Sequence, residues 1–403
     1  MAATQVSVKP ENKSKKIYVR RPEDRQRQKQ TAKIVRLVGE IDRPFLILVL
    51  VLLGIGSVMI FSASYPSALS KYGDSFYTAR KHLVFVALGM LVLAVTTKFA
   101  DYRWLKRFST LLFLVAIGMN ILTAIPGIGL VRNGARRWLN LGFTDVQPSE
   151  ILKFALILIC AKWITDNAGE MKKFSKGVLP FALFLLASIV PTIMQKHMSC
   201  TIILCAIVFV MMWFGGTSVI FFGTCVGVGA AGIFVVLQTM AHSMARIAVW
   251  RDPFIDPKGD GYQPIQSLYA ICAGGFFGLG LGQSNQKHAY LPEAHNDYIF
   301  SILCEELGFF GAAVVLFLFA ALVWRGFVIA KRAPNRYASL LVMGIICSLA
   351  IHVLLNIAVV TNTLPSTGIG LPFFSYGGTS LWIWLAQMGV ILSVSRYSYL
   401  DRG

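Results

Sequence analysis

Residues 299–324 read IFSILCEELGFFGAAVVLFLFAALVW, an almost unbroken apolar run that is long enough to cross a lipid bilayer as a helix. Residues 291–298, directly before it, read LPEAHNDY, and Glu305 and Glu306 lie inside the run. Ionisable side chains at a membrane boundary cost free energy unless they are solvated or paired, so they indicate a functional site. The chain is therefore expected to span a membrane and to carry its site near Asp297.

The same apolar character extends along the chain. Of its 403 residues 56% are hydrophobic and only 14% are charged, and the mean hydropathy is +0.64. The hydrophobic fraction is higher, and the charged fraction lower, than in a soluble domain. We predict an all-α, polytopic integral membrane protein with about ten transmembrane helices, near residues 44–65, 82–99, 108–127, 150–165, 178–195, 199–216, 218–241, 299–324, 338–361 and 379–395.

The polar N-terminal segment and the basic residues predict the orientation. Residues 1–42 have more Lys and Arg than Asp and Glu and are too long for the charged start of a signal peptide, so we expect a disordered cytoplasmic tail. Its charge suits an anionic inner leaflet rather than nucleic acid. Because most of the 38 Lys and Arg fall on one side, both termini are expected in the cytoplasm. Residues 43–403 then form the membrane domain, with outward excursions at about 128–149 and 242–298.

Two other classes of site are disfavoured by the cysteine pattern. The seven cysteines include no CxxC pair, and most lie inside apolar runs. This argues against a disulfide framework and against a zinc site.

The first outward excursion contains a basic and aromatic group. Arg136, Arg137 and Trp138 are consecutive, as expected for a lipid headgroup contact or for an interfacial anchor without further function. Glu150 and Lys153 follow at a spacing of three residues, which places them on one face of a helix. A structural ion pair is the favoured interpretation, with a catalytic role as the alternative.

Asp297 lies where the second excursion meets the span that begins at residue 299. At this position a carboxylate is either a helix N-cap or an available general base. Glu305 and Glu306 lie two to three turns further into the same helix, where we expect a buried, paired structural role. Glu293 and His295 are supporting residues that could join a divalent-cation site.

A third irregular segment, residues 364–380, reads LPSTGIGLPFFSYGGTS between the last two spans. Irregular backbone at membrane depth is tolerated where protein or water satisfies its polar groups. The segment is therefore expected either to face the Asp297 loop or to form an ordinary outer loop.

Three motifs in register resemble one known family. They are GARRWLNLG with QPSEILK, then YLPEAHNDYIFSILCEELG, then LPSTGIGLPFFSYGGTS, in a ten-span chain. In this order they are similar to the SEDS (shape, elongation, division and sporulation) proteins. The stretch QSNQKHAYLPEAHND is most like the division branch, with the rod-shape and sporulation branches as alternatives.

The resemblance implies a peptidoglycan glycosyltransferase that polymerises lipid II at the outer face of a bacterial cytoplasmic membrane, with a lipid II flippase as the alternative. It implies that Asp297 is catalytic. Its expected partners are lipid II and undecaprenyl-linked glycan, a class B penicillin-binding protein and other divisome proteins, and its possible cofactor is a divalent cation such as Mg or Mn. Cations must hold the leaving pyrophosphate. The predicted substrate-binding residues are Arg136, Arg137, Trp138, Lys153, Arg246, Arg251 and Lys287.

Overall fold

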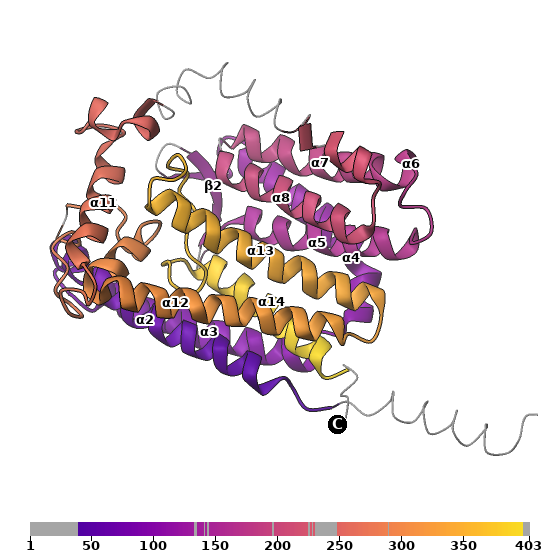
Figure 1. Cartoon of the computed structure of the whole chain (residues 1–403), viewed down its shortest axis with the longest axis horizontal. Coiled ribbons are helices and arrows are strands. Elements are labelled where there is room, and N and C mark those ends of the chain that lie inside the picture. The colour runs from indigo at the N-terminus through magenta and orange to yellow at the C-terminus, as the bar shows by residue number, and fades with distance from the viewer. Residues whose placement is uncertain are drawn as a thin grey trace, which may run out of the picture. The chain divides into compact units, whose positions relative to one another are not determined.

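The structure is a computed structural model that describes residues 39–132, 135–140, 142, 145–195, 197–224, 226, 227, 229, 248–288 and 290–397. Most of these residues are helical (Figure 1). The helices are α2 (Arg43–Tyr72), α3 (Tyr77–Phe99), α4 (Tyr102–Ala124), α5 (Pro148–Asp166), α6 (Phe174–Gly177), α7 (Leu179–Met194), α8 (Met198–Gly215), the short 3-10 helix η1 (Pro253–Ile255), α11 (Tyr262–Gly274), α12 (Ile299–Lys331), α13 (Arg336–Val360) and α14 (Gly378–Ser395).

The predicted polytopic helical architecture is confirmed. In the described ranges, 8 helices are long and apolar enough to cross a membrane, with α6 and α7 counted as one. They correspond to eight of the ten predicted spans, and α5 corresponds to a ninth, although it carries several charged side chains. The remaining predicted span, 218–241, lies largely outside the described residues, as do residues 1–38 of the predicted tail.

The pattern of burial matches a helical bundle whose outside faces lipid. The helices α13 and α14 are the most enclosed of the candidate spans, whereas α3 is the least enclosed and packs along α14 (Figure 1). On α3, Leu83, Leu91 and Phe99 are 60–70% exposed. Such apolar exposure is unfavourable in water and favourable against lipid tails, which explains why these residues are stable on a surface.

A small antiparallel sheet forms in the first excursion, where no strand was predicted. Its order is β1 (Gly129–Arg132), β2 (Ala135–Asn140) and β3 (Asp145–Val146), with Leu130 opposite Trp138 and Leu139 opposite Val146. The strands lie against α4 and α5. Pairing between strands satisfies backbone polar groups that a loop beside the membrane would leave exposed.

The second excursion contains η1 and α11, and α11 ends at Gly274, where the glycine-rich stretch begins. This stretch, residues 274–282, reads GGFFGLGLG and is not helical beyond Gly274. Its backbone instead pairs with α12, since Leu279 N–H donates to Glu305 O at 3.0 Å and Phe309 N–H donates to Gly275 O at 2.9 Å. These bonds form where α12 is interrupted by the non-helical backbone of Gly308, with φ 68° and ψ −170°.

At the opposite end of α12, two chain segments distant in sequence meet. Asp42 caps α2 by accepting from Phe45 N–H at 3.0 Å, and its carboxylate also pairs with Arg325 of α12 at 2.8 Å. The Asp42 N–H donates to the Ser395 hydroxyl at the end of α14. The start of α2 and the end of α14 therefore lie at the same end of the bundle.

Candidate functional site

Asp297 lies on the segment that leads into α12, and its side chain does not cap that helix. The helix begins after Tyr298 without a side-chain hydrogen bond to its first turn. The capping interpretation of Asp297 is therefore wrong for this structure. Its backbone carbonyl is held instead, because Asn356 of α13 donates to Asp297 O at 2.9 Å and to Ile369 O at 2.6 Å.

The loop between α13 and α14 forms the second wall around this carboxylate. A Cβ placed on Gly368 would lie 3.2 Å from Asp297 Oδ2, and Gly368 has a left-handed φ of +64° that a residue with a side chain rarely adopts. The loop is held by the Ser375 hydroxyl, which donates to Asn296 O at 2.7 Å, and by Tyr376 N–H, which donates to His295 O at 3.0 Å. The segment 364–380 therefore does face Asp297.

The surroundings raise the proton affinity of Asp297. Burial, and to a smaller extent the negative charge of Glu293, raise the pKa of its carboxyl to about 6, although the positive charge of Arg137 opposes the shift. Burial also lowers the pKa of His295, although Glu293 acts in the opposite direction. At neutral pH the site therefore holds a carboxylate that is more basic than an exposed Asp, next to a neutral imidazole.

Arg137 belongs to β2, a strand that packs against α4 and α5. Because successive side chains of a strand point to opposite faces, Arg137 lies on the face opposite that of Arg136 and Trp138. Arg137 influences Asp297, and all three residues of this group are partly buried. The structure thus brings one of the predicted cations close to the carboxylate.

Lys153 of α5 contacts the two partners that its burial requires. Its Nζ lies 2.7 Å from Glu150 Oε1 and 2.8 Å from His352 Nε2 of α13. His352 Nδ1 lies 2.9 Å from Ser348 O, which assigns the proton to Nδ1 and leaves Nε2 to accept from Lys153. Ser149, at the start of the same helix, makes no cap, because the N-cap is Gln147 and has no side-chain bond.

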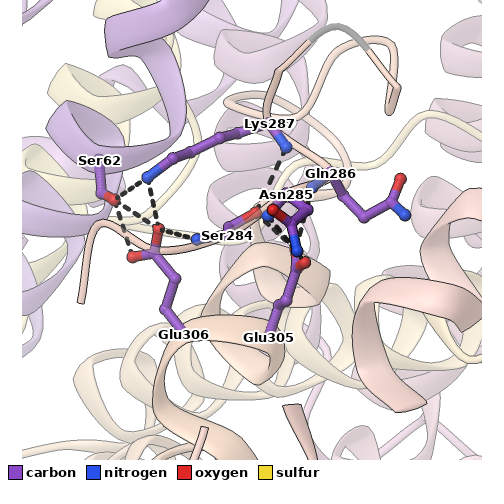
Figure 2. Close-up of polar contacts among 7 residues, drawn as sticks. All are labelled: Ser62, Ser284, Asn285, Gln286, Lys287, Glu305 and Glu306. Atoms are coloured by element: carbon purple, nitrogen blue, oxygen red, sulfur yellow. Dashed lines mark hydrogen bonds and ion pairs between the residues drawn. The ribbon is translucent and has the colours of Figure 1, made fainter. Parts of the chain in front are cut away.

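Lys287 occupies a different place from the one expected of a substrate-binding cation. Its side chain is fully buried, and its Nζ lies 2.9 Å from Glu306 Oε1 (Figure 2). Glu305 accepts from the Ser284 hydroxyl at 2.5 Å and from Asn285 N–H at 2.9 Å. Lys287 is therefore not available to contact pyrophosphate. Glu306 is ion-paired, and Glu305 is hydrogen-bonded.

Of the two other predicted cations, the structure describes only Arg251. Arg251 is exposed in the second excursion, just before η1, and Arg246 lies outside the described residues.

In the same part of the chain a cavity of about 340 Å³ opens among aromatic and polar side chains. Its lining includes Pro292 and Ser366, which belong to the two segments that enclose Asp297. Tyr298 donates to Ser366 at 3.3 Å and so connects the cavity wall to the site.

Several buried polar atoms in the segments around Asp297 have no hydrogen-bond partner among the described residues. They include Asn296 Oδ1, Asn356 Oδ1 and Thr367 Oγ1, each of which belongs to a residue in or beside the two walls. Unsatisfied buried polar atoms are rare in folded proteins and indicate places where water, an ion or a ligand completes the bonding.

The sequence did not lead us to predict Asn356 and His352 as site residues. Their polar side chains inside the apolar span 338–361 were a signal that could have indicated them.

Comparison with known proteins gives the family. The model of the cell cycle protein family FtsW/RodA/SpoVE matches residues 43–400. This chain belongs to that family. It is 40% identical to stage V sporulation protein E of Bacillus subtilis over 89% of this chain and 97% of that protein. It is 38% identical to the probable peptidoglycan glycosyltransferase FtsW of Trichlorobacter lovleyi over 89% of this chain and 94% of that protein.

Solved structures of the family share the fold. One chain of a structure described as the structural coordination of polymerization and crosslinking by a peptidoglycan synthase complex has a TM-score of 0.73 and 27% identity, covering 90% of this chain and 99% of that one. The rod shape determining protein RodA of Thermus thermophilus has a TM-score of 0.66 at 24% identity, covering 90% of this chain and 98% of that one. The second likeness concerns the fold alone.

Proposed function

We propose that this chain is a peptidoglycan glycosyltransferase that polymerises lipid II at the outer face of a bacterial cytoplasmic membrane, for septal synthesis in cell division. The observation that carries the proposal is the enclosed carboxylate of Asp297, whose pKa is raised to about 6 within reach of the charge of Arg137. A general base works best when its pKa lies near the operating pH. Membership of the family and the name of the FtsW relatives supply the reaction class.

The proposed reaction uses Asp297 as the base. Asp297 removes the proton from the 4-hydroxyl of an acceptor GlcNAc, and that oxygen forms a bond to the anomeric carbon of a lipid-linked MurNAc. The bond from this carbon to undecaprenyl pyrophosphate breaks, and the pyrophosphate leaves with the electron pair. Arg137 stabilises the charge that develops on the leaving group, because a guanidinium matches phosphate oxygens.

The other cations take supporting roles in this proposal. Lys153 already has Glu150 and His352 as partners, which fix the position of its ammonium group. We therefore assign Lys153 the role of a second, fixed positive charge that supports Arg137. Arg136 and Trp138 are assigned to the lipid headgroup on the other face of β2. Arg251 and Arg246 are assigned to the outer part of the substrate.

A divalent cation fits this site only as an ion shared with the substrate. The described residues contain no group of three or more His, Cys, Asp or Glu that could hold a metal by themselves. The unpartnered Asn296 Oδ1 and the Glu293 carboxylate beside Asp297 offer oxygen ligands. Mg²⁺ is commonly bound by one or two protein oxygens together with phosphate oxygens, and it would neutralise charge on the pyrophosphate.

The proposed partner is a class B penicillin-binding protein that crosslinks the new strand, with other divisome proteins around it. The similarity to a chain of a peptidoglycan synthase complex supports an assembly of this kind.

Reconstitution tests the function directly. Purified chain in liposomes with labelled lipid II is expected to produce glycan chains, because all groups of the proposed reaction belong to this chain. Translocation of lipid II without polymer would instead support the flippase alternative. Against that alternative, Glu305 and Glu306 are fully buried and bonded to protein, so they do not line a polar path through the described part of the bundle.

We also infer that both termini lie in the cytoplasm. The meeting of Asp42 and Ser395 supports termini on the same side. In a chain whose native cysteines are replaced, Lys258→Cys is expected to react with an impermeant maleimide from outside, and Lys172→Cys only after permeabilisation. Both positions are exposed. The reverse pattern would place Asp297 on the cytoplasmic side and contradict the proposed reaction, since lipid II is polymerised outside.

A further inference from the structure

A buried charged cluster that the proposed reaction does not use connects three segments of the chain (Figure 2). Lys287 and Glu306 have completely buried side chains at 2.9 Å. Lys287 also donates to the Ser62 hydroxyl of α2 at 3.2 Å, and Ser62 donates to Glu306 at 2.7 Å. Glu305, next in the helix, accepts from the Ser284 hydroxyl. The side chains of these five polar residues are thus hydrogen-bonded or paired inside the protein.

The cluster connects two parts of the chain that lie before and after Asp297. Residues 284–287 are bonded to Glu305 and Glu306, and Asp297 lies about midway along the intervening chain. On one side Asp297 is joined to Glu306 by the helical residues 299–306. On the other side residues 290–296 are folded by local bonds, such as Leu291 N–H to Gln286 O at 2.9 Å and Asn296 N–H to Glu293 O at 2.9 Å. The cluster therefore closes a ring of chain that carries Asp297.

We propose that the Lys287–Glu306 pair is a positioning device for Asp297: it closes this ring and attaches it to α2 through Ser62. The inference rests on the proposed function in one respect, namely that Asp297 is the base. Lys287 and Glu306 are positioning residues and do not contact substrate.

The helix α2 provides the reference against which the ring is placed. It contacts the ring at Ser62 and the opposite wall of the site near Gly56, where an added Cβ would lie 2.2 Å from Phe373 O. Phe373 belongs to the same loop as Gly368, which faces Asp297. Both walls of the site therefore contact α2. We infer that the distance between the two walls depends on the cluster. Small displacements of a reacting group have large effects on rate, about 10²-fold for 1 Å.

A stability role alone makes a different prediction from a positioning role. Removing one partner leaves an unpaired buried charge, which destabilises any protein, whereas replacing both partners by apolar residues is often neutral for stability. If the pair only stabilises the fold, activity recovers together with thermal stability. If the pair positions Asp297, stability recovers and activity does not. Two apolar side chains cannot reproduce the bonds that Lys287 and Glu306 make to the Ser62 hydroxyl, or the one that Glu306 accepts from Ser284 N–H at 3.4 Å.

The test compares Lys287→Met, Glu306→Gln and the double variant Lys287→Met/Glu306→Leu in the full chain, with Tm and lipid II polymerisation measured on the same sample. We expect the single variants to lose Tm, and the double variant to recover it while kcat stays about 10- to 10²-fold below wild type. KM should change little, since Arg137 on β2 is untouched. Lys287→Arg keeps the charge with a different shape, and it should lower kcat with a smaller loss of Tm.

The control is Arg325→Met, which breaks the pair with Asp42 that joins the same two helices at their other end. It should lower Tm and leave kcat per folded molecule unchanged. Hydrogen exchange of residues 288–298 gives a readout without activity: the double variant should lose protection there, even if wild type makes no polymer and the proposed function fails. Wild-type kcat and wild-type exchange in the double variant would overturn the proposal.

Discussion

The variant Asp297→Asn is expected to fold, insert and bind lipid II, yet polymerise it about 10² to 10⁴ times more slowly than wild type, because an amide cannot accept the proton. The stability of the fold should not decrease. Burial already disfavours the charged carboxylate, whose pKa is raised to about 6, and the side chain makes no cap that Asn would need to preserve. At pH 7.5 the neutral amide should therefore leave Tm equal to wild type or higher.

The pH dependence of the wild-type chain checks the same assignment. Since the base must be ionised, kcat/KM should fall as the pH decreases through about 6, the pKa to which burial and Glu293 raise this carboxyl. The control Glu293→Gln removes the nearby negative charge, so the acidic limb of its profile should shift to lower pH. An Asn variant with near wild-type polymerisation would contradict the base assignment.

Gly308→Ala is expected to cause a large loss of stability. Gly308 has φ 68° and ψ −170°, a conformation essentially restricted to glycine, which alone costs about 1 to 3 kcal/mol for another residue. A Cβ there would lie 2.3 Å from Gly278 N and 2.6 Å from Phe276 O, so the backbone must also move. The measurement is the change in Tm of the purified chain.

Gly118→Ala is the matched control for this variant. Gly118 is a helical residue of α4 whose added Cβ would meet no atom within 4 Å, so alanine should be neutral or stabilising by about 0.4 to 1 kcal/mol. Because residues 299–307 carry the site into α12, Gly308→Ala should also lower polymerisation. Equal Tm values for the two variants would show that the break in α12 is not needed by the fold.

The sequence predicted the spans well because length and apolar content decide which segments cross lipid. The predicted span 299–324 lies within α12, and 338–361 coincides with α13 to within a few residues. Strands in the first excursion were not predicted, because β2 is short and its apolar residues do not alternate regularly. The break in α12 at Gly308 was also not predicted from the sequence, because a glycine within an apolar span is usually compatible with a continuous helix.

The sequence by itself determined that the chain is a helical membrane protein and that Asp297 lies at the start of a span, because hydropathy and charge act locally along the chain. Only the tertiary structure decided which polar groups meet. It placed Asn356 and Gly368 at Asp297, and it paired Lys287 with Glu306 and Ser62. A buried charge must find its partner wherever packing puts one, and packing between helices far apart in the chain leaves no periodic signal in the sequence.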